Sequence, residues 1–155
     1  MSKAALLVLD MQNELIDPKG KVGAEGFAKV VAERKLIEKI RKVLDAMRAR
    51  GLPVVFVRVG FRADYADAIS QSARLKRIKK MNAIVIGTWG LEFPELIKPL
   101  ETEMVYTKRA VNPFFNTGLL TWLYCHGVTT LALCIGMNVA AFAVAPVDER
   151  DRATI

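Results

Sequence analysis

Two polar residues stand at the ends of apolar, strand-like segments, and their types suit acid–base chemistry. Asp10 ends the run 4–9, and Lys108 ends the run 104–107. A carboxylate can take up and return a proton during a reaction, and a nearby ammonium group stabilises the charged carboxylate. Ligands of open α/β sheets bind outside the carboxyl ends of the strands, so these two residues predict a catalytic site at that edge.

A third apolar segment, 129–135, leads into Gly136 and Asn138. Its nearly continuous aliphatic character is typical of a strand that is buried on both faces of a parallel sheet. Gly136 and Asn138 then reach the same edge of the sheet as Asp10 and Lys108. The sequence thus predicts one site built from three strand ends.

The segments between these strands predict helices. Apolar residues recur at helical spacing through 30–47 and predict one helix, which Gly51 ends as a C-terminal glycine. The β-branched run 54–59 follows as a second strand, which completes a strand–helix–strand unit. Further helices are predicted over 68–80 and 118–126, whereas 82–87 fits either a strand or an apolar loop. This alternation is typical of an α/β fold with a mostly parallel sheet.

Composition favours a single soluble domain. The chain has 155 residues, of which 52% are hydrophobic, so it can bury one substantial core, and we expect one domain over 1–155. No apolar run approaches the roughly 20 residues that span a bilayer, and the N-terminus does not resemble a signal peptide. We therefore expect a cytoplasmic protein without a membrane partner. Cys125 and Cys134 lie in apolar segments and are expected to be buried free thiols.

The formal net charge of +7 raises the question of a nucleic-acid partner. Much of the excess lies in 29–50, where basic residues alternate with acids, and in the compact cluster R-L-K-R-I-K-K at 74–80. No recognised reader motif and no stacking aromatic residues accompany this cluster. We interpret it as a solvated helix face or an interface rim, and we expect no nucleic-acid partner.

Four motifs occur in an order and spacing that resemble one family. They are L-L-V-L-D-M-Q-N around Asp10, G-T-W-G-x-E-F from Gly87, V-Y-T-K-R-x-x-x-P-F-F-N-T-x-L around Lys108, and G-M-N-V from Gly136. Together they resemble the isochorismatase-like, or cysteine hydrolase, family over 3–139, which is nearly the whole chain.

This resemblance implies a three-layer α/β/α fold with a Rossmann-like sheet of strand order 3-2-1-4-5-6. It also implies a catalytic triad of Asp, Lys and Cys, in which Asp10 matches the acid and Lys108 matches the lysine. The family's cysteine stands two residues after the asparagine that matches Asn138, and this sequence has Ala140 at that position.

The absence of a thiol at Ala140 bears directly on the reaction. In the cysteine-using members that the sequence resembles, a thiolate attacks a carbonyl or nitrile carbon and the carboxylate transfers the proton. Members without the cysteine cleave the vinyl ether of isochorismate, where protonation by the Asp and attack by water suffice. The alternatives are an acid-catalysed hydrolase, a hydrolase with different chemistry, an inactive binding or oligomerising module, and an altered or misaligned segment. Cys134 lies six residues too early and is interpreted as a packed core thiol.

The expected substrate is a small planar amide, a nitrile, or an ester-like or vinyl-ether metabolite. The predicted substrate-binding residues are Gln12, Trp89, Phe115, Gly136 and Asn138. No cofactor is expected, because D-M-Q-N follows the first strand where a dinucleotide-binding fold has G-x-G-x-x-G. No metal is expected either: the zinc-binding relatives, the nicotinamidases, use an Asp and two His, and His126 is the only histidine.

The C-terminal part departs from the family pattern. A helix is expected after Asn138, with the sequence A-A-F-A-V-A-P, and Pro146 should end or kink it. Relatives continue beyond this helix with further strands, so the sheet is expected to be truncated at its C-terminal edge. Exposed apolar edge strands are usually covered, which predicts a homo-oligomer, a dimer or tetramer, or a marginally stable fold.

Overall fold

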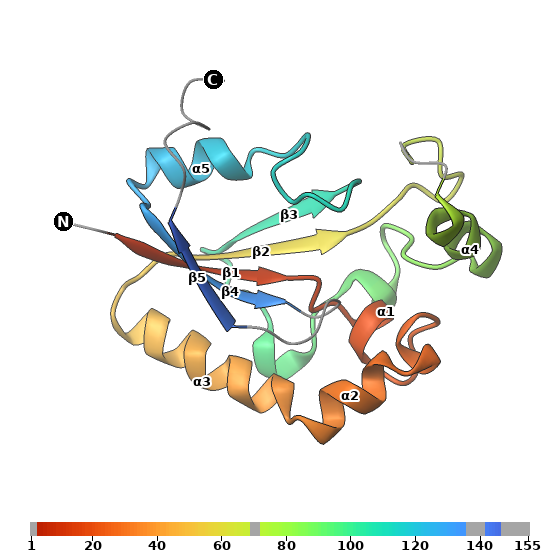
Figure 1. Ribbon diagram of the computed structural model, residues 1–155, viewed down its shortest axis with the longest axis horizontal. Helices are drawn as coiled ribbons and strands as arrows, with labels where there is room; N and C mark the ends of the chain where they lie inside the picture. The colour runs from red at the N-terminus through yellow and green to blue at the C-terminus, as the bar shows by residue number, and fades with distance from the viewer. Residues whose placement is uncertain (1–2, 69–71, 136–141, 147–155) are drawn as a thin grey trace.

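A five-stranded sheet of order β3-β2-β1-β4-β5 forms the centre of the molecule (Figure 1). The computed structural model describes residues 3–68, 72–135 and 142–146, the last range by its backbone alone. The strands are β1 (Ala4–Leu9), β2 (Val54–Val59), β3 (Met104–Lys108), β4 (Thr130–Ile135) and β5 (Phe142–Pro146). The first four run parallel to one another, and β5 pairs antiparallel with β4. The predicted α/β fold with a mostly parallel sheet is confirmed.

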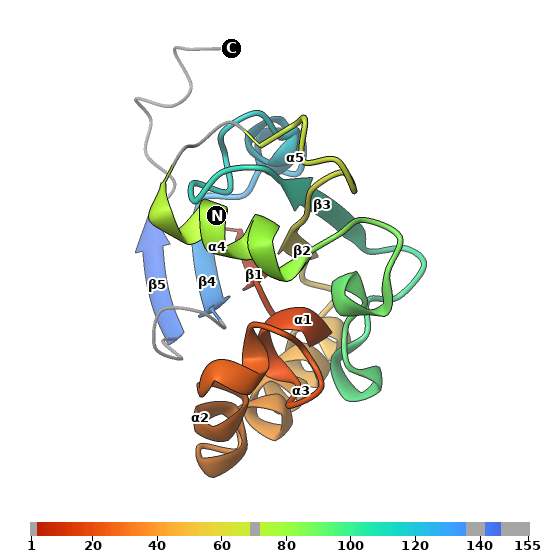
Figure 2. The same ribbon diagram turned by 90° about the vertical axis from the view of Figure 1, so that its right-hand side faces the viewer.

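Helices cover both faces of this sheet and its carboxyl edge. They are α1 (Asn13–Ile16), α2 (Phe27–Glu33), α3 (Leu36–Ala49), α4 (Ala73–Met81) and α5 (Leu119–Cys125), with short 3₁₀ turns η1 (Gly23–Glu25), η2 (Trp89–Leu91) and η3 (Glu95–Ile97). α3 lies below the sheet and α5 above it, which makes the three layers (Figure 1). Seen from the carboxyl ends of the strands, α4 lies in front of the sheet (Figure 2).

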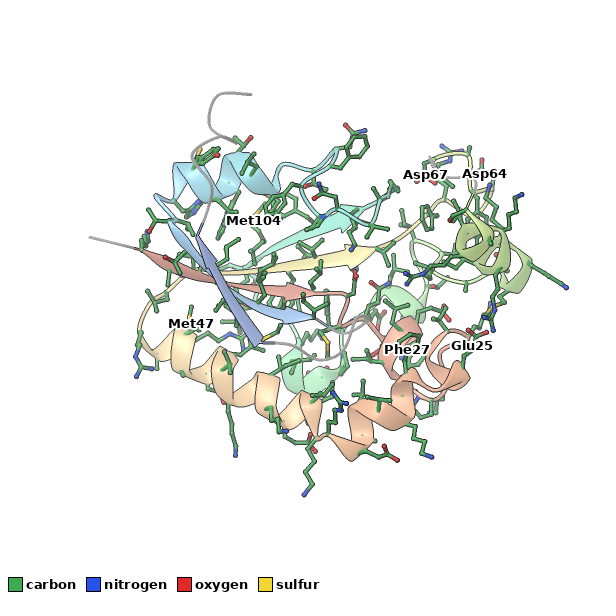
Figure 3. All side chains as sticks on the ribbon, in the orientation of Figure 1. Glu25, Phe27, Met47, Asp64, Asp67 and Met104 are labelled. Atoms are coloured by element: carbon green, nitrogen blue, oxygen red, sulfur yellow. The ribbon has the colours of Figure 1, made fainter. Side chains whose placement is uncertain are left out.

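The two faces of β1 explain why the sheet holds two cores. Side chains alternate along a strand. Leu6 and Val8 therefore join the core between the sheet and α3, whereas Leu7 and Leu9 join the core between the sheet and α5. The helices supply matching stripes of buried residues, Leu36, Ile40 and Leu44 from α3 and Leu119 and Leu123 from α5. Figure 3 shows the side chain of Met47 between α3 and the sheet, where it packs at the border of the first core.

The single helix predicted through 30–47 is wrong, because the chain breaks it into α2 and α3. Lys35 lies between them with φ 50°, a left-handed conformation that a continuous right-handed helix cannot contain. The predicted end of α3 is confirmed. Gly51 has φ 62°, and the N–H groups of Gly51 and Leu52 donate to Arg48 and Met47 at 3.0 Å, which satisfies carbonyls of the last turn.

The helix predicted after Asn138 is also corrected, since 142–146 is the strand β5. Its backbone pairs with β4 in a register that runs from Thr130 opposite Pro146 to Cys134 opposite Phe142. A helix would hydrogen-bond only its own backbone groups. A strand at this place also forms hydrogen bonds with the backbone N–H and C=O groups on the outer side of β4. Tertiary pairing therefore outweighs the local helical pattern.

The region between β2 and β3 differs in detail from the prediction. α4 begins at Ala73, after the hydroxyl of Ser72 accepts a bond from the N–H of Leu75, so Ala68 lies outside the helix. Residues 82–87 form a loop that pairs with the chain just after β2 through one isolated bridge between Val85 and Phe61. None of the helices described is long and apolar enough to cross a membrane.

The two cysteines differ in their surroundings. Cys134 on β4 is buried, as expected, but Cys125 is exposed. Cys125 is the last residue of α5, and Leu119 and Leu123 occupy the face that this short helix turns to the sheet. The expectation of two buried thiols therefore holds for Cys134 alone.

Candidate active site

Asp10 leaves the sheet at the carboxyl end of β1 with its side chain inside the molecule. Its N–H donates to the carbonyl of Val57 at 2.9 Å, which continues the pairing of β1 with β2 by one residue. The backbone then turns through φ 58°, a left-handed conformation that Asp adopts more readily than most residues. The side chain is held at this edge, and the residue is only 8% exposed.

Lys108, at the carboxyl end of β3, meets Asp10 although β2 lies between their strands. Its ammonium Nζ is 2.9 Å from Asp10 Oδ2 and donates a second hydrogen bond to the carbonyl of Val111 at 3.0 Å. The residue is 3% exposed, so the ion pair is buried. The structure therefore brings together the two strand-end residues that the sequence singles out.

The two oxygens of the Asp10 carboxyl group have different surroundings. Oδ2 pairs with Lys108, but Oδ1 is buried and has no hydrogen-bond partner among the described residues. Burial raises the pKa of Asp10, and the opposing charges of Lys108 and, more weakly, Arg74 reduce this rise. A buried carboxyl group with a raised pKa and an unpartnered oxygen is suited to proton transfer.

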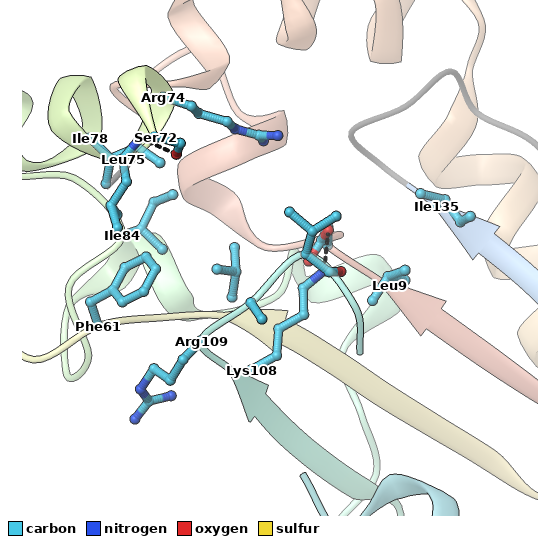
Figure 4. Close-up of a pocket in the computed structure, with 14 residues that line it drawn as sticks. Leu9, Phe61, Ser72, Arg74, Leu75, Ile78, Ile84, Lys108, Arg109 and Ile135 are labelled. Atoms are coloured by element: carbon cyan, nitrogen blue, oxygen red, sulfur yellow. Dashed lines mark hydrogen bonds and ion pairs between the residues drawn. The ribbon is translucent and has the colours of Figure 1, made fainter. Parts of the chain in front are cut away.

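A cavity of about 180 Å³ opens beside this pair. Leu9, Asp10, Val59, Lys108 and Ile135 line it from the carboxyl ends of the strands, and Arg109, Ala110 and Val111 line it from the chain after β3. Phe61, Ser72, Arg74, Leu75, Ile78 and Ile84 line it from the loops between β2 and η2 and from α4. Figure 4 shows Lys108 on one side of this space and the labelled residues of α4, Leu75 and Ile78, on the other. The volume is below the about 300–1,000 Å³ of pockets for drug-sized ligands and suits a small metabolite.

A second ion pair fixes the wall next to Lys108. The guanidinium of Arg109 pairs with Asp67 in the loop after β2 and donates to the carbonyl of Thr107 at 3.1 Å. The Asp67 carboxylate also accepts the N–H of Arg62 at 3.0 Å. These bonds attach the loop after β2 to the end of β3, so the two segments form one continuous wall.

Three predicted substrate-binding residues lie outside the lining of this cavity. Gln12 is fully buried, and its side-chain amide accepts from the N–H of Val59 at 2.8 Å and donates to its carbonyl at 2.7 Å. It holds the end of β2 beside Asp10 and does not reach the cavity. Trp89 and Phe115 are 44% and 52% exposed, and neither is among the residues that line the cavity. Their contact with a substrate stays a prediction.

The remaining predicted site residues, Gly136, Asn138 and Ala140, lie outside the described residues. Ile135, which directly precedes them, lines the cavity. Cys134 on the same strand is 2% exposed, and burial raises its pKa to about 12, as expected for a packed core thiol. Within the described ranges, no group of three or more His, Cys, Asp or Glu side chains is placed to hold a metal ion.

Sequence reasoning missed the wall of the cavity that α4 provides. Arg74 belongs to the basic cluster interpreted as a solvated helix face, and Leu75 and Ile78 are the apolar residues within it. The amphipathic spacing indicated that one face of this helix is buried, but not which part of the molecule that face packs against. That neighbour is set by the long connection from β2, whose course depends on contacts distant in sequence, such as the bridge between Phe61 and Val85.

Known proteins resemble this chain in sequence and in fold. Residues 4–138 match the family model described as the isochorismatase domain. The ureidoacrylate amidohydrolase of Agrobacterium fabrum is 29% identical over 151 residues, which cover 89% of this chain and 66% of that protein. The enzyme of the same name from Stutzerimonas stutzeri is 30% identical, with 89% and 60% covered. The chain thus spans less than two thirds of the length of these curated relatives.

Solved structures also resemble this chain. The N-carbamoylsarcosine amidase of Thermoplasma acidophilum superposes with a TM-score of 0.65 at 28% identity, covering 86% of this chain and 67% of that one. An isochorismatase family protein of Desulfovibrio vulgaris superposes with a TM-score of 0.73 at 28% identity, covering 87% and 67%. The matched family model includes β1 to β4 and therefore both Asp10 and Lys108. The chain belongs to the isochorismatase family.

Proposed function

We propose that the chain is a hydrolase domain that acts on a small amide-type metabolite, with Asp10 as its acid–base group and Lys108 as the cation that holds Asp10 in place. The observation that carries the proposal is that Asp10, which lines a small cavity, has a buried oxygen, Oδ1, without a hydrogen-bond partner among the described residues. An unsatisfied buried carboxyl oxygen is unfavourable for stability, so its presence at a cavity supports a functional role.

The substrate class is supported by the relatives and by the size of the cavity. Two of the similar proteins are named for amide hydrolysis, a ureidoacrylate amidohydrolase and an N-carbamoylsarcosine amidase. The cavity of about 180 Å³ suits substrates of a similarly small size. We also propose a nitrile or a vinyl ether as further substrate classes, because the same acid–base group can serve them.

Ala140 occupies the position of the family's cysteine, so the proposed nucleophile is water. For an amide, the Asp10 carboxylate takes a proton from water while the water oxygen bonds to the carbonyl carbon. The carboxylic acid formed then returns that proton to the leaving nitrogen as the carbon–nitrogen bond breaks. The side chain of Lys108, whose Nζ lies 2.9 Å from Oδ2, stabilises the Asp10 carboxylate whenever it is charged.

A vinyl ether would use Asp10 in the opposite order, with the protonated acid acting first. The acid would donate its proton to the terminal vinyl carbon, and water would add to the oxocarbenium ion and return a proton to the carboxylate. The hemiketal formed would then move its hydroxyl proton to the ether oxygen as the carbon–oxygen bond breaks, which releases a ketone and an alcohol. The raised pKa of Asp10 favours this order, because more of the acid form is present as the pH approaches neutrality. The pH profile separates the two: kcat/KM falls as pH rises through the Asp10 pKa for a vinyl ether and rises for an amide.

The test is a hydrolase screen of the purified chain against ureidoacrylate, N-carbamoyl amino acids, simple nitriles and isochorismate. We expect turnover of at least one compound and its loss in Asp10→Asn. A parallel Ala140→Cys variant asks whether a thiol restores a faster covalent route on amides. Turnover that survives Asp10→Asn would contradict the role of Asp10.

A second candidate, a binding or oligomerising module without catalysis, is favoured by one observation, the alanine at position 140. It predicts that compounds of the screen bind to the original chain without being hydrolysed. Hydrolysis by the Ala140→Cys variant alone would support this candidate, because it would mean that the scaffold is intact and lacks only its nucleophile.

A further inference from the structure

Asp10 and Lys108 meet although their strands are not neighbours, because β2 lies between β1 and β3. The 2.9 Å between Asp10 Oδ2 and Lys108 Nζ therefore depends on the spacing of three strand ends. The paired register of β1 with β2 ends at Leu9 opposite Val57. The N–H of Asp10 still donates to the carbonyl of Val57 at 2.9 Å, and the chain then turns away from β2 through φ 58°. Beyond this point the backbone of β1 does not hold β2.

The side chain of Gln12 continues this pairing beyond the end of β1. Val59 lies two residues after Val57, so its N–H and carbonyl face the same side of β2. The Gln12 amide bonds both groups: Oε1 accepts the N–H of Val59 at 2.8 Å, and Nε2 donates to its carbonyl at 2.7 Å. Gln12 is 0% exposed, so this contact lies inside the molecule. One side chain thus takes the place of the next strand residue.

A single peptide unit joins this contact to Lys108. The carbonyl of Val59 accepts from Gln12, and the N–H of Gly60, which belongs to the same planar unit, donates to the carbonyl of Lys108 at 3.2 Å. Val59 is also the residue opposite Lys108 in the pairing of β2 with β3. Because a peptide unit resists twisting, a shift of Val59 relative to Gln12 displaces Lys108 as well.

We propose that Gln12 is a positioning residue, which fixes the end of β2 between Asp10 and Lys108 and thereby sets the separation of their side chains. Gln12 is not part of the described cavity lining, whereas Val59 is, so Gln12 acts through its neighbours. This inference rests on the proposed function only for its effect on turnover. Its effect on the ion pair is measured without a substrate.

The experiment measures the coupling of Asp10 with Lys108 in the presence and absence of the Gln12 amide. Urea unfolding of the original chain, Asp10→Asn, Lys108→Met and the double variant gives a coupling factor, by which the two single effects on the unfolding constant fail to multiply. The four proteins are then made again with Gln12→Met, which keeps the length of the side chain, and with Asn13→Ala. Asn13 is the matched control: it is the next residue and a buried amide, but its Nδ2 donates at 3.1 Å to Trp89, outside the cavity lining.

We expect Gln12→Met to reduce the coupling factor by about tenfold, because the ammonium of Lys108 then lies farther from the Asp10 carboxylate. Asn13→Ala should change the factor by about twofold or less, although it also lowers stability. If Gln12 only stabilises the fold, Gln12→Met destabilises all four proteins equally. An unchanged coupling factor would therefore overturn the inference.

A reciprocal measurement needs no Gln12 variant and covers the case in which Gln12→Met does not fold. Coupling free energies are reciprocal, so a pair that Gln12 positions must itself stabilise the contact of Gln12 with Val59. After correction for global stability, hydrogen exchange of the Val59 N–H should be about tenfold faster in Asp10→Asn/Lys108→Met than in the original chain. The N–H of Asn13, whose bond at 2.8 Å does not involve β2, should change little. Equal protection of the Val59 N–H in both proteins overturns the inference.

Turnover separates this inference from the proposed function. A loss of coupling in Gln12→Met, in a chain that hydrolyses no compound of the screen, supports the positioning role and counts against the hydrolase. If the chain is a hydrolase, Gln12→Met should lower kcat more than it raises KM, because it displaces the acid–base pair. Hydrolysis with an unchanged kcat in Gln12→Met would support the hydrolase and overturn the positioning role.

Discussion

Two carboxyl groups are buried within four residues of each other after β1, and they are held in opposite ways. Glu14 in α1 is satisfied by backbone groups: Oε1 accepts the N–H of Lys21 at 2.6 Å, and Oε2 accepts the N–H of Ile84 at 3.3 Å. It attaches the turn after α1 to the 82–87 loop and does not line the cavity. Gly90 lies so close that a Cβ there would be 2.5 Å from Oε2.

Asp10, in contrast, leaves one oxygen without a partner among the described residues, and Asp10 is one of the residues that line the cavity. Both groups are buried, so burial alone does not distinguish a structural carboxylate from a reactive one. The distinguishing features are the unsatisfied oxygen of Asp10 and the place of this residue in the lining of a ligand-sized cavity. Substitutions at the two positions should therefore separate activity from stability.

The largest expected effect is the loss of turnover in Asp10→Asn. An amide cannot exchange the proton, so kcat/KM for any substrate found in the screen should fall by about 10²-fold or more. Glu14→Gln should leave kcat/KM per folded molecule close to that of the original chain. Steady-state kinetics with the folded fraction determined by circular dichroism make the comparison. Similar losses of kcat/KM in both variants would mean that Asp10→Asn lowers activity at least partly because it disturbs the fold.

The next effect is on stability, in the buried pair itself. Lys108→Met leaves the Asp10 carboxyl without its cation and should reduce the free energy of unfolding by about 3–5 kcal/mol. The double variant Asp10→Asn/Lys108→Met removes both charges and should recover much of that loss, because no buried charge remains unpaired. Urea unfolding of the two variants measures the difference. A double variant as unstable as Lys108→Met would contradict the electrostatic explanation.

A smaller loss of stability is expected where Glu14 holds the backbone. Glu14→Gln replaces one acceptor oxygen by a donor and leaves the N–H of Lys21 or Ile84 without its partner, at a cost of about 1–3 kcal/mol. Gly90→Ala should destabilise through the same carboxylate, since the added Cβ displaces it. Chemical denaturation checks both variants. If Gly90→Ala destabilises a Glu14→Ala background as much as the original chain, the contact with Glu14 is not the cause.

The smallest effect is a pH dependence of stability that belongs to Asp10. Burial raises the pKa of this carboxyl in the folded chain, and the charge of Lys108 opposes the rise. The folded state therefore keeps a proton that the unfolded chain loses near the usual Asp pKa of about 4. The contribution of Asp10 to stability is present below that pKa and is lost as the pH rises through the higher pKa of the folded state. The Asp10→Asn variant should not lose stability in this way, because it has no carboxyl group at this position.

The measurement is the difference in unfolding free energy between the original chain and Asp10→Asn at a series of pH values from about 3 upward. As the pH rises, the original chain should lose stability relative to Asp10→Asn. A constant difference would mean that the Asp10 pKa is the same in both states. A difference that favours the original chain at higher pH would mean that the pair with Lys108 outweighs the effect of burial.

The sequence by itself determined the parts of this protein that depend on local pattern and on strand ends. The aliphatic runs at β1, β2 and β4 predicted strands of a parallel sheet, and the carboxyl ends of parallel strands share one edge. Asp10 and Lys108 were therefore predictable as neighbours although 98 residues separate them. The order of the motifs predicted the family as well.

Only the tertiary structure decided what those local patterns leave open. The helical pattern of 30–47 contained a break at Lys35, and the segment 142–146 became a strand because it pairs with β4. The place of α4 beside the site, where Leu75 and Ile78 line the cavity, depends on the course of the chain after β2. Local periodicity states which face of an element is apolar, but contacts between residues distant in the sequence decide what that face covers.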